Sequence, residues 1–165
     1  MDKTIDKFYG EYRWLSNFWA CHITIQWSGN VIHFPAKSVE HGYQALKARF
    51  FDDFVKILWL ESPGKAKRYA RNMAIRPDWE SVKISIMRDL IRQKFSDKNP
   101  ELKKLLIDTN DIYLIEGNNW HDNFWGVCSC NSIRCKKQSL NWLGQILMET
   151  RDELSSRSNS NLLTS

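Results

Sequence analysis

Apolar residues recur at helical spacing in the middle of the chain and gather in short β-rich runs near its start. Between Trp79 and Phe95 an apolar side chain returns every three or four positions, which predicts an amphipathic helix with Asp78 as its N-cap. Ser62 followed by Pro63 predicts the start of another helix, because proline suits the first helical position.

Two runs rich in β-branched and aromatic residues, His22–Trp27 and Val31–Phe34, predict strands. The segment 28–30, Ser-Gly-Asn, predicts the turn of a β-hairpin that ends at Pro35. The expected fold is therefore α+β, a single compact domain that is mostly helical with a small antiparallel sheet.

One domain is expected over residues 1–154, because neither a linker nor an internal repeat divides the 165-residue chain. The remaining residues, 155–165, read SSRSNSNLLTS. They are mostly polar and predict a disordered tail.

Composition and charge restrict the class of protein. No apolar run approaches the roughly 20 residues that span a bilayer. The first ten residues, MDKTIDKFYG, lack the apolar stretch of a secretory signal. We therefore expect a cytoplasmic protein with no membrane partner. The net charge of +5 is compatible with a phosphate-bearing ligand or with nucleic acid and proves neither.

The eight tryptophans are many for a chain of this length, and several stand beside Asn, Asp, Ser or Gly. Aromatic rings next to polar groups can stack on a base or a sugar. For any single tryptophan the simpler interpretation is a place in the hydrophobic core, so the aromatic content alone selects no function.

Three of the four cysteines, Cys128, Cys130 and Cys135, lie within eight residues. A structural zinc site usually has four ligands, with two to four residues between paired cysteines. The first two cysteines are closer than that, and the fourth ligand is missing unless His121 or Cys21 supplies it. The sequence therefore favours reduced thiols in a loop, with no metal and no cofactor.

The segment SVEHGYQALK, residues 38–47, predicts a helix with a serine N-cap that runs to about Phe51. Glu40, Gln44 and Lys47 stand at i, i+4 and i+7 and therefore share one face. Such a polar face is most often a solvated surface. The functional alternative is a carboxylate in the first helical turn, ionised and placed beside a sugar to stabilise an oxocarbenium-like transition state or to activate water.

Five segments follow one another along the chain: FYGEYRWLSNF (8–18), SVEHGYQALKA (38–48), RPDWESVKISIM (76–87), WGVCSC (125–130) and NWLGQILMETR (141–151). Together they resemble the YbiA-like family, also called NADAR. Each motif alone is weak, and their combination and order are specific. The resemblance extends over most of the chain.

The resemblance implies a mixed α+β domain that hydrolyses N-glycosidic bonds of phosphoribosyl or ADP-ribosyl compounds. Two substrate classes are associated with the family. One is the phosphoribosylated pyrimidine intermediates of early riboflavin synthesis. The other is ADP-ribose attached to a nucleobase, notably guanine in DNA, which would make ADP-ribosylated nucleic acid a partner. The motifs do not choose between these classes.

The resemblance also implies site residues at the positions that match the family motifs. Glu40 matches the acidic residue of the EHxxQA helix and is the first candidate for catalysis. Asp122, three residues before Trp125, is the candidate second carboxylate. A carboxyl separation of about 5 Å would indicate a retaining route, and roughly 6.5–9.5 Å would indicate direct attack by water. The other matches have implied substrate-binding roles, with amides for ribose or base, rings for stacking and lysines for phosphates: Asn17, Phe18, Gln44, Lys47, Trp79, Lys83, Asn118, Trp125 and Gly126.

Several of these residues have an equally simple structural interpretation. Trp79 can belong to the core, Asn118 to a turn, and Asp122 can cap a loop. Lys83 can pair with Glu80 or Asp78 on a solvated face.

Two other classes of protein share features with the enzyme. A non-catalytic module that binds ADP-ribose or a nucleotide would show the same stacking and phosphate contacts, but it would not need Glu40. A nucleic-acid-binding protein is the third interpretation, weakened by basic residues that are spread along the chain without a dense cluster.

Overall fold

The pattern of contacts divides the chain into two units, and each is described by itself. The computed structural model describes residues 3–27, 29, 31–135 and 138–162, which leaves out parts of the predicted hairpin turn and of the predicted tail. The central unit comprises residues 17–100, and the terminal unit comprises residues 1–16 and 101–165. The assignment of residues 1–154 to one domain stays a prediction.

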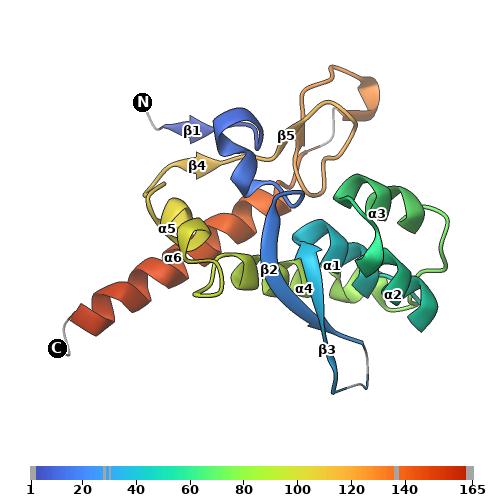
Figure 1. Cartoon of the computed structure of the whole chain (residues 1–165). Coiled ribbons are helices and arrows are strands. Elements are labelled where there is room, and N and C mark those ends of the chain that lie inside the picture. The colour runs from blue at the N-terminus through green and yellow to red at the C-terminus, as the bar shows by residue number, and fades with distance from the viewer. Residues whose placement is uncertain (1–2, 28, 30, 136–137, 163–165) are drawn as a thin grey trace. The chain divides into compact units, whose positions relative to one another are not determined.

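The described part of the central unit contains a β-hairpin followed by four α-helices (Figure 1). Its elements are β2 (Ala20–Gln26), β3 (His33–Ser38), α1 (Val39–Leu46), α2 (Phe51–Trp59), α3 (Pro63–Ala70) and α4 (Trp79–Lys94). Ser62 caps α3 as predicted, because its Oγ accepts a hydrogen bond from the backbone N–H of Lys65 at 3.2 Å. α4 begins behind Asp78 as predicted, but the Asp78 carboxylate binds the Arg76 guanidinium instead of capping the helix (Oδ1 to Nε 2.6 Å).

β2 and β3 form the predicted antiparallel hairpin, but the prediction that it ends at Pro35 is wrong. Pro35 pairs with Thr24, and β3 continues to Ser38. The backbone N–H of Thr24 donates to the Gln93 side chain at 2.9 Å rather than to β3. Thr24 and Pro35 therefore form a non-hydrogen-bonded pair, so the missing N–H of proline removes no bond from the ladder.

α1 ends at Leu46, before the predicted end at about Phe51. The chain leaves the helix because Ala48 forms a β-bridge with Ile75, far along the sequence. α2 then begins at Phe51. Long-range backbone pairing replaces the hydrogen bonds that a longer α1 would have made, and the local sequence does not reveal such pairing.

α1 contacts β2, β3, α2, α3 and α4 within the central unit, and all its residues from Val39 to Ala45 are buried. Gly42 permits the close packing, because a Cβ there would lie 3.0 Å from Leu90 Cδ2 and 3.3 Å from Ile23 Cδ1. A helix that is covered on all sides usually carries apolar residues. Polar side chains on α1 therefore need a separate explanation.

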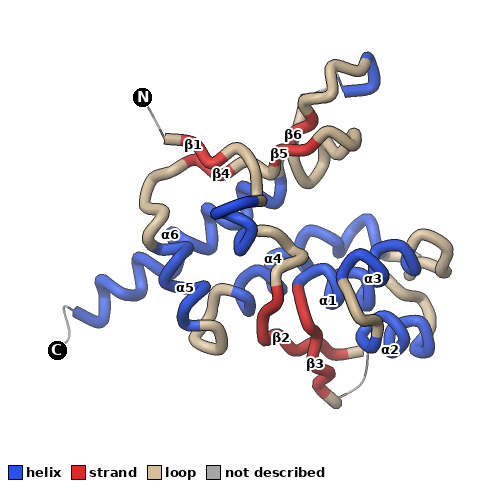
Figure 2. The backbone as a smooth tube through the Cα atoms, turned by 45° about the horizontal axis from the view of Figure 1, so that its top comes forward, coloured by secondary structure: helices blue, strands red, loops and turns tan. Residues whose placement is uncertain are grey.

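The described part of the terminal unit is made of short strands, two 3-10 helices and two α-helices (Figure 2). Its elements are β1 (Thr4–Ile5), η1 (Gly10–Leu15), α5 (Pro100–Ile107), β4 (Tyr113–Leu114), β5 (Gly117–Asn118), β6 (Val127–Cys128), η2 (Ile133–Cys135) and α6 (Trp142–Leu162). β1 pairs with β4 and β5 pairs with β6, both in parallel.

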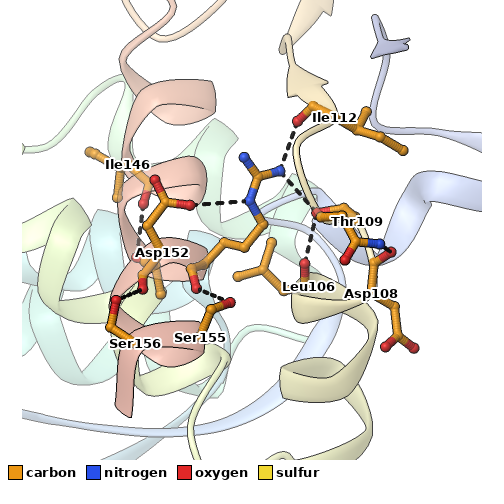
Figure 3. Close-up of polar contacts among 11 residues, drawn as sticks. Leu106, Asp108, Thr109, Ile112, Ile146, Asp152, Ser155 and Ser156 are labelled. Carbon is orange, nitrogen blue, oxygen red and sulfur yellow. Dashed lines mark hydrogen bonds and ion pairs between the residues drawn. The ribbon is translucent and has the colours of Figure 1, made fainter. Parts of the chain in front are cut away.

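Arg151 anchors α6 within the terminal unit. Its buried guanidinium donates to Thr109 Oγ1 at 3.1 Å and to the Ile112 carbonyl at 2.7 Å (Figure 3). α6 continues to Leu162, through residues for which the sequence predicted disorder. The Ser155 hydroxyl donates to the Arg151 carbonyl at 3.0 Å, so a polar side chain of this segment is satisfied inside the helix.

The elements give the predicted α+β class, with helices outweighing small sheets. The predicted antiparallel sheet is the β2–β3 hairpin. The parallel pairing of β1 with β4 and of β5 with β6 was not predicted, because strands of two residues carry no signal that selects their partner. Within the described ranges, no helix combines the length and the apolar character that crossing a membrane would require.

Candidate active site

The polar face of α1 is buried, so it is not the solvated surface that its pattern most often indicates. Glu40, Tyr43 and Gln44 are only 5%, 7% and 7% exposed. Burial of a carboxylate is unfavourable unless hydrogen bonds and charges compensate. Such a residue is therefore a candidate for chemistry.

Glu40 lies in the first turn of α1 and is held there by hydrogen bonds. Gln44, one helical turn later, donates from Nε2 to Glu40 Oε1 at 2.9 Å. The Glu40 backbone N–H donates to the carbonyl of Asn17 at 2.9 Å. The amide donor and the N-terminal end of the helix both stabilise negative charge at this carboxylate.

Asn17 and Gln44, which both contact Glu40, each bury an amide oxygen. Asn17 Oδ1 and Gln44 Oε1 have no hydrogen-bond partner among the described residues. The nitrogen of each amide is already used, by Met87 Sδ (3.5 Å) and by Glu40. A buried acceptor without a partner costs about 1–3 kcal/mol, so such groups are uncommon. Both oxygens are covered by protein atoms in this structure, so a ligand hydroxyl reaches them only where a neighbouring side chain moves aside.

Phe18 and Trp79, the aromatic residues predicted to bind substrate in this unit, differ in their exposure. Trp79 is buried and packs edge-to-face against Tyr43, with ring centroids 4.8 Å apart and an interplanar angle of 62°. Phe18 is 43% exposed, and the Lys67 ammonium lies 5.7 Å from its ring centroid. Phe18 therefore has the accessible ring that stacking requires, whereas Trp79 supports α1 from the core.

Lys47 interacts electrostatically with Glu40, and Lys83 interacts electrostatically with Lys47. Burial lowers the pKa of Lys47 below 10.5, the carboxylates of Glu40 and Glu80 act in the opposite direction, and Lys83 adds to the lowering. The Lys83 ammonium also pairs with Glu80 Oε2 at 2.5 Å, one of the two partners that the structural interpretation offered. Neighbouring lysines of which one is partly desolvated are suited to binding an anion.

His41, which the sequence analysis did not single out, fixes the start of α1. Its Nδ1 lies 2.8 Å from Ser38 Oγ, and its Nε2 lies 3.2 Å from the Leu60 carbonyl oxygen. Ser38 Oγ also accepts the His41 backbone N–H at 3.3 Å, which confirms the predicted N-cap. We assign the neutral imidazole, in which Nε2–H donates to the Leu60 carbonyl and Nδ1 accepts the Ser38 hydroxyl. Burial lowers the pKa of His41 below 6.5, in agreement with this assignment.

Stability is expected to fall when the pH drops below 6.5, because the unfolded chain then takes up a proton that folded His41 excludes. The free energy of unfolding should fall by up to about 1.4 kcal/mol per pH unit, until the pH passes below the lowered pKa of the folded state. His41→Asn should lack this component. Urea unfolding of both proteins between about pH 7 and about pH 5 measures it. A difference between the two proteins that stays constant over this range would contradict the neutral assignment.

In the terminal unit, Asn118 and Asp122 build the loop between β5 and β6. Asn118 Nδ2 donates to the Asp122 carbonyl at 2.7 Å, and Asn118 Oδ1 accepts the Asp122 backbone N–H at 3.2 Å. Asp122 Oδ1 accepts the backbone N–H groups of Phe124 and Trp125 at 3.0 and 2.8 Å. Both side chains have the structural roles that were the alternative to function, and a catalytic role for Asp122 stays a prediction.

Trp125 and Gly126 end the same loop. The half-buried Trp125 ring packs edge-to-face on Phe124, with centroids 5.0 Å apart. Gly126 leaves no room for a side chain, because a Cβ would lie 2.1 Å from the Glu116 carbonyl oxygen and 2.9 Å from Asn118 Nδ2. The close approach of two backbone segments accounts for this glycine.

The predicted site residues therefore fall into two groups, each placed by its own unit. The central unit brings Asn17, Gln44 and Lys47 around Glu40. Its His41 was missed, although the Glu-His pair of the motif was the available signal. The terminal unit holds Asn118, Asp122, Trp125 and Gly126 in one loop.

The fold and the sequence are similar to those of proteins of one class. The NMR structure of the E. coli protein YbiA superposes with a TM-score of 0.74 and 32% identity, over 96% of this chain and 89% of that chain. The N-glycosidase YbiA of Shigella flexneri serotype 5b is 35% identical over 161 residues, which cover 93% of this chain and 91% of the relative. The class that this relative represents is that of hydrolases acting on N-glycosyl bonds.

A family model for the NADAR domain matches residues 7–155, and the chain belongs to the NADAR family. The resemblance drawn from the motifs and the YbiA-like fold are thereby confirmed. Riboflavin biosynthesis proteins of Vibrio vulnificus and Zea mays are each 36% identical, over 154 and 134 residues. The chain spans 37% and 20% of the lengths of these two relatives.

Proposed function

We propose that the chain is an N-glycosidase that hydrolyses the N-glycosidic bond of phosphoribosyl or ADP-ribosyl compounds, with Glu40 as its catalytic residue. The observation that carries the proposal is the buried Glu40 carboxylate, held by Gln44 beside amide oxygens that lack partners. Relatives named N-glycosidase support the reaction class. A module that only binds a nucleotide has no need of a buried carboxylate, which is unfavourable for stability.

Hydrolysis of a C1′–N bond develops positive charge at C1′ and the ring oxygen. Water supplies the hydroxyl group that bonds to C1′, the electron pair of the broken bond leaves with the nitrogen, and that nitrogen takes up the remaining proton, by way of solvent. Glu40 stabilises the positive charge or takes a proton from the water, and both roles need an ionised carboxylate. In this scheme neighbouring side chains move aside on binding, Asn17 Oδ1 and Gln44 Oε1 accept ribose hydroxyls, and these bonds hold C1′ near Glu40. The scheme uses no cofactor.

The other parts of the substrate find suitable groups in the central unit as well. Phe18 exposes a ring on which a base can stack, a contact worth about 1–3 kcal/mol. Lys47 and Lys83 supply positive charge for a phosphate. Phosphoribosyl-pyrimidines and ADP-ribosyl-guanine both contain a ribose, a base and phosphate, so both substrate classes stay within the proposal.

Lys47→Met is expected to raise KM for a phosphate-bearing substrate about 10–100-fold and to change kcat less, because methionine keeps the aliphatic volume and removes the charge. Since burial lowers the pKa of Lys47, wild-type protein should lose this contribution to substrate affinity at a pH below 10.5, and Lys47→Met should not show that loss. Steady-state kinetics over the alkaline range measures both effects. Lys65→Met, at an exposed lysine paired with Glu61, is the matched control. An unchanged KM in Lys47→Met would remove Lys47 from the site.

The proposed function is tested by incubating the protein with ADP-ribosyl-guanine in DNA and, separately, with a phosphoribosylated pyrimidine intermediate. Mass spectrometry of the released base reads out cleavage. We expect release of the base from at least one substrate. Release from only one of them identifies the substrate class. Binding of both substrates without release of the base would contradict the enzyme and indicate a non-catalytic binding module.

A further inference from the structure

Four potential metal ligands, His121, Cys128, Cys130 and Cys135, gather at one point of the terminal unit. Each offers one ligand atom, and these atoms all lie within 4.8 Å of one another. His121 Nδ1 lies 3.2 Å from Cys130 Sγ and 3.2 Å from Cys135 Sγ. In a tetrahedral zinc site, with Zn–S of about 2.3 Å and Zn–N of about 2.05 Å, adjacent sulfur and nitrogen ligands are about 3.6 Å apart. The cluster therefore has close to the dimensions of a zinc coordination shell.

The backbone around the cluster presents these side chains from separate local structures. Cys128 ends β6 and Cys135 ends η2. His121 has a φ of +71°, a left-handed conformation that histidine adopts more readily than most residues. Asn118 Oδ1 accepts the backbone N–H groups on both sides of His121, those of Trp120 and Asp122, and so holds the histidine in place.

The structure also decides which residue supplies the fourth ligand, which the sequence left open between His121 and Cys21. Cys21 lies on β2 in the central unit and does not belong to the cluster. Burial raises the pKa of its thiol, as for an ordinary half-buried cysteine. His121 completes a set of three sulfurs and one nitrogen, which is typical of structural zinc and unsuited to the harder ions Mg²⁺ and Ca²⁺.

We propose that the terminal unit binds a structural zinc ion through His121, Cys128, Cys130 and Cys135. Binding releases one proton from each of the three thiols, and the neutral imidazole contributes no charge. Four protein ligands fill a tetrahedral shell, so the ion has no open position for water or substrate and acts on structure. It links His121, next to Asp122 in the loop between β5 and β6, to Cys128 at the end of β6. The inference does not depend on the proposed reaction.

The first test is the metal content of the purified full chain, measured by mass spectrometry after gel filtration under reducing conditions. We expect about one zinc ion per chain. Protein stripped of metal and loaded with Co²⁺ should show thiolate-to-cobalt charge transfer and the intense visible bands of tetrahedral cobalt. Metal content near zero after incubation with Zn²⁺, or a weak octahedral cobalt spectrum, would overturn the proposal.

Variants test whether zinc binds to the four clustered residues and not to Cys21. Cys130→Ser and His121→Ala should lose the zinc, whereas Cys21→Ser should retain it. His121→Cys should restore binding, because Nδ1 and a cysteine sulfur both lie close to the backbone. Circular dichroism checks that each variant is folded. If Cys130→Ser does not fold, the comparison of His121→Ala with His121→Cys tests the proposal. Zinc retained in His121→Ala at the wild-type content would contradict the assigned ligands.

Discussion

Replacing Glu40 by glutamine is expected to lower kcat by about 10³-fold or more while leaving substrate binding nearly unchanged. Glutamine keeps the shape of the side chain, and its amide oxygen can still accept the hydrogen bond from Gln44 Nε2. The backbone bond to Asn17 is untouched. The negative charge that the transition state requires is lost, and a factor of 10³ corresponds to about 4 kcal/mol of activation free energy. Single-turnover rates and calorimetric binding of the same substrate separate the two effects.

Thermal stability distinguishes a catalytic Glu40 from a structural one. Because the carboxylate is buried, removal of its charge should leave Tm unchanged or raise it. A structural carboxylate would show a loss of Tm together with the loss of activity. Glu61→Gln is the matched control, since Glu61 is exposed and pairs with Lys65 on the surface. Turnover at the wild-type rate in Glu40→Gln would remove Glu40 from the mechanism.

The burial of the polar face of α1 depends on tertiary packing, which the local sequence does not reveal. Helical spacing predicted that Glu40 and Gln44 lie one turn apart, and the bond between them confirms it. Spacing did not predict that this face is buried, because the cover comes from both strands of the hairpin and from α2, α3 and α4. The end of the helix was missed for the same reason, since the bridge between Ala48 and Ile75 joins distant segments. Local caps such as Ser38 were predictable because their partners lie within one turn.

In the terminal unit, predictions from residue type were limited by loop geometry. The spacing of Cys128, Cys130 and Cys135 gave three thiols and left the fourth ligand open between His121 and Cys21. His121 joins the cluster through a left-handed backbone conformation that no spacing rule describes. The two-residue strands β5 and β6 carry no pattern of their own. The pairing of these strands nevertheless fixes the loop, and we therefore expect a substitution of Gly126 to lower stability strongly.

Gly126→Ala is expected to lower the free energy of unfolding by about 3 kcal/mol, and Tm by about 10 °C. The added Cβ would lie 2.1 Å from the carbonyl oxygen of Glu116, which already accepts the backbone N–H of Val127 at 2.9 Å. Backbone atoms cannot rotate away as a flexible side chain can. The paired strands β5 and β6 must therefore move apart. The close packing of Gly126 against the Asn118 side chain, which organises the loop, is then lost as well. Urea and thermal unfolding measure the loss of stability.

Gly64→Ala provides the control, because a Cβ at Gly64 would meet nothing within 4 Å. Gly64 lies in the first turn of α3, where alanine should raise stability by about 0.5–1 kcal/mol. The two substitutions add the same methyl group, so their opposite signs isolate the close backbone approach from any general effect of the added carbon. Equal stability of the two variants would show that the segments around Gly126 can move apart without cost. The glycine would then have to be explained by contact with a ligand and not by packing of the loop.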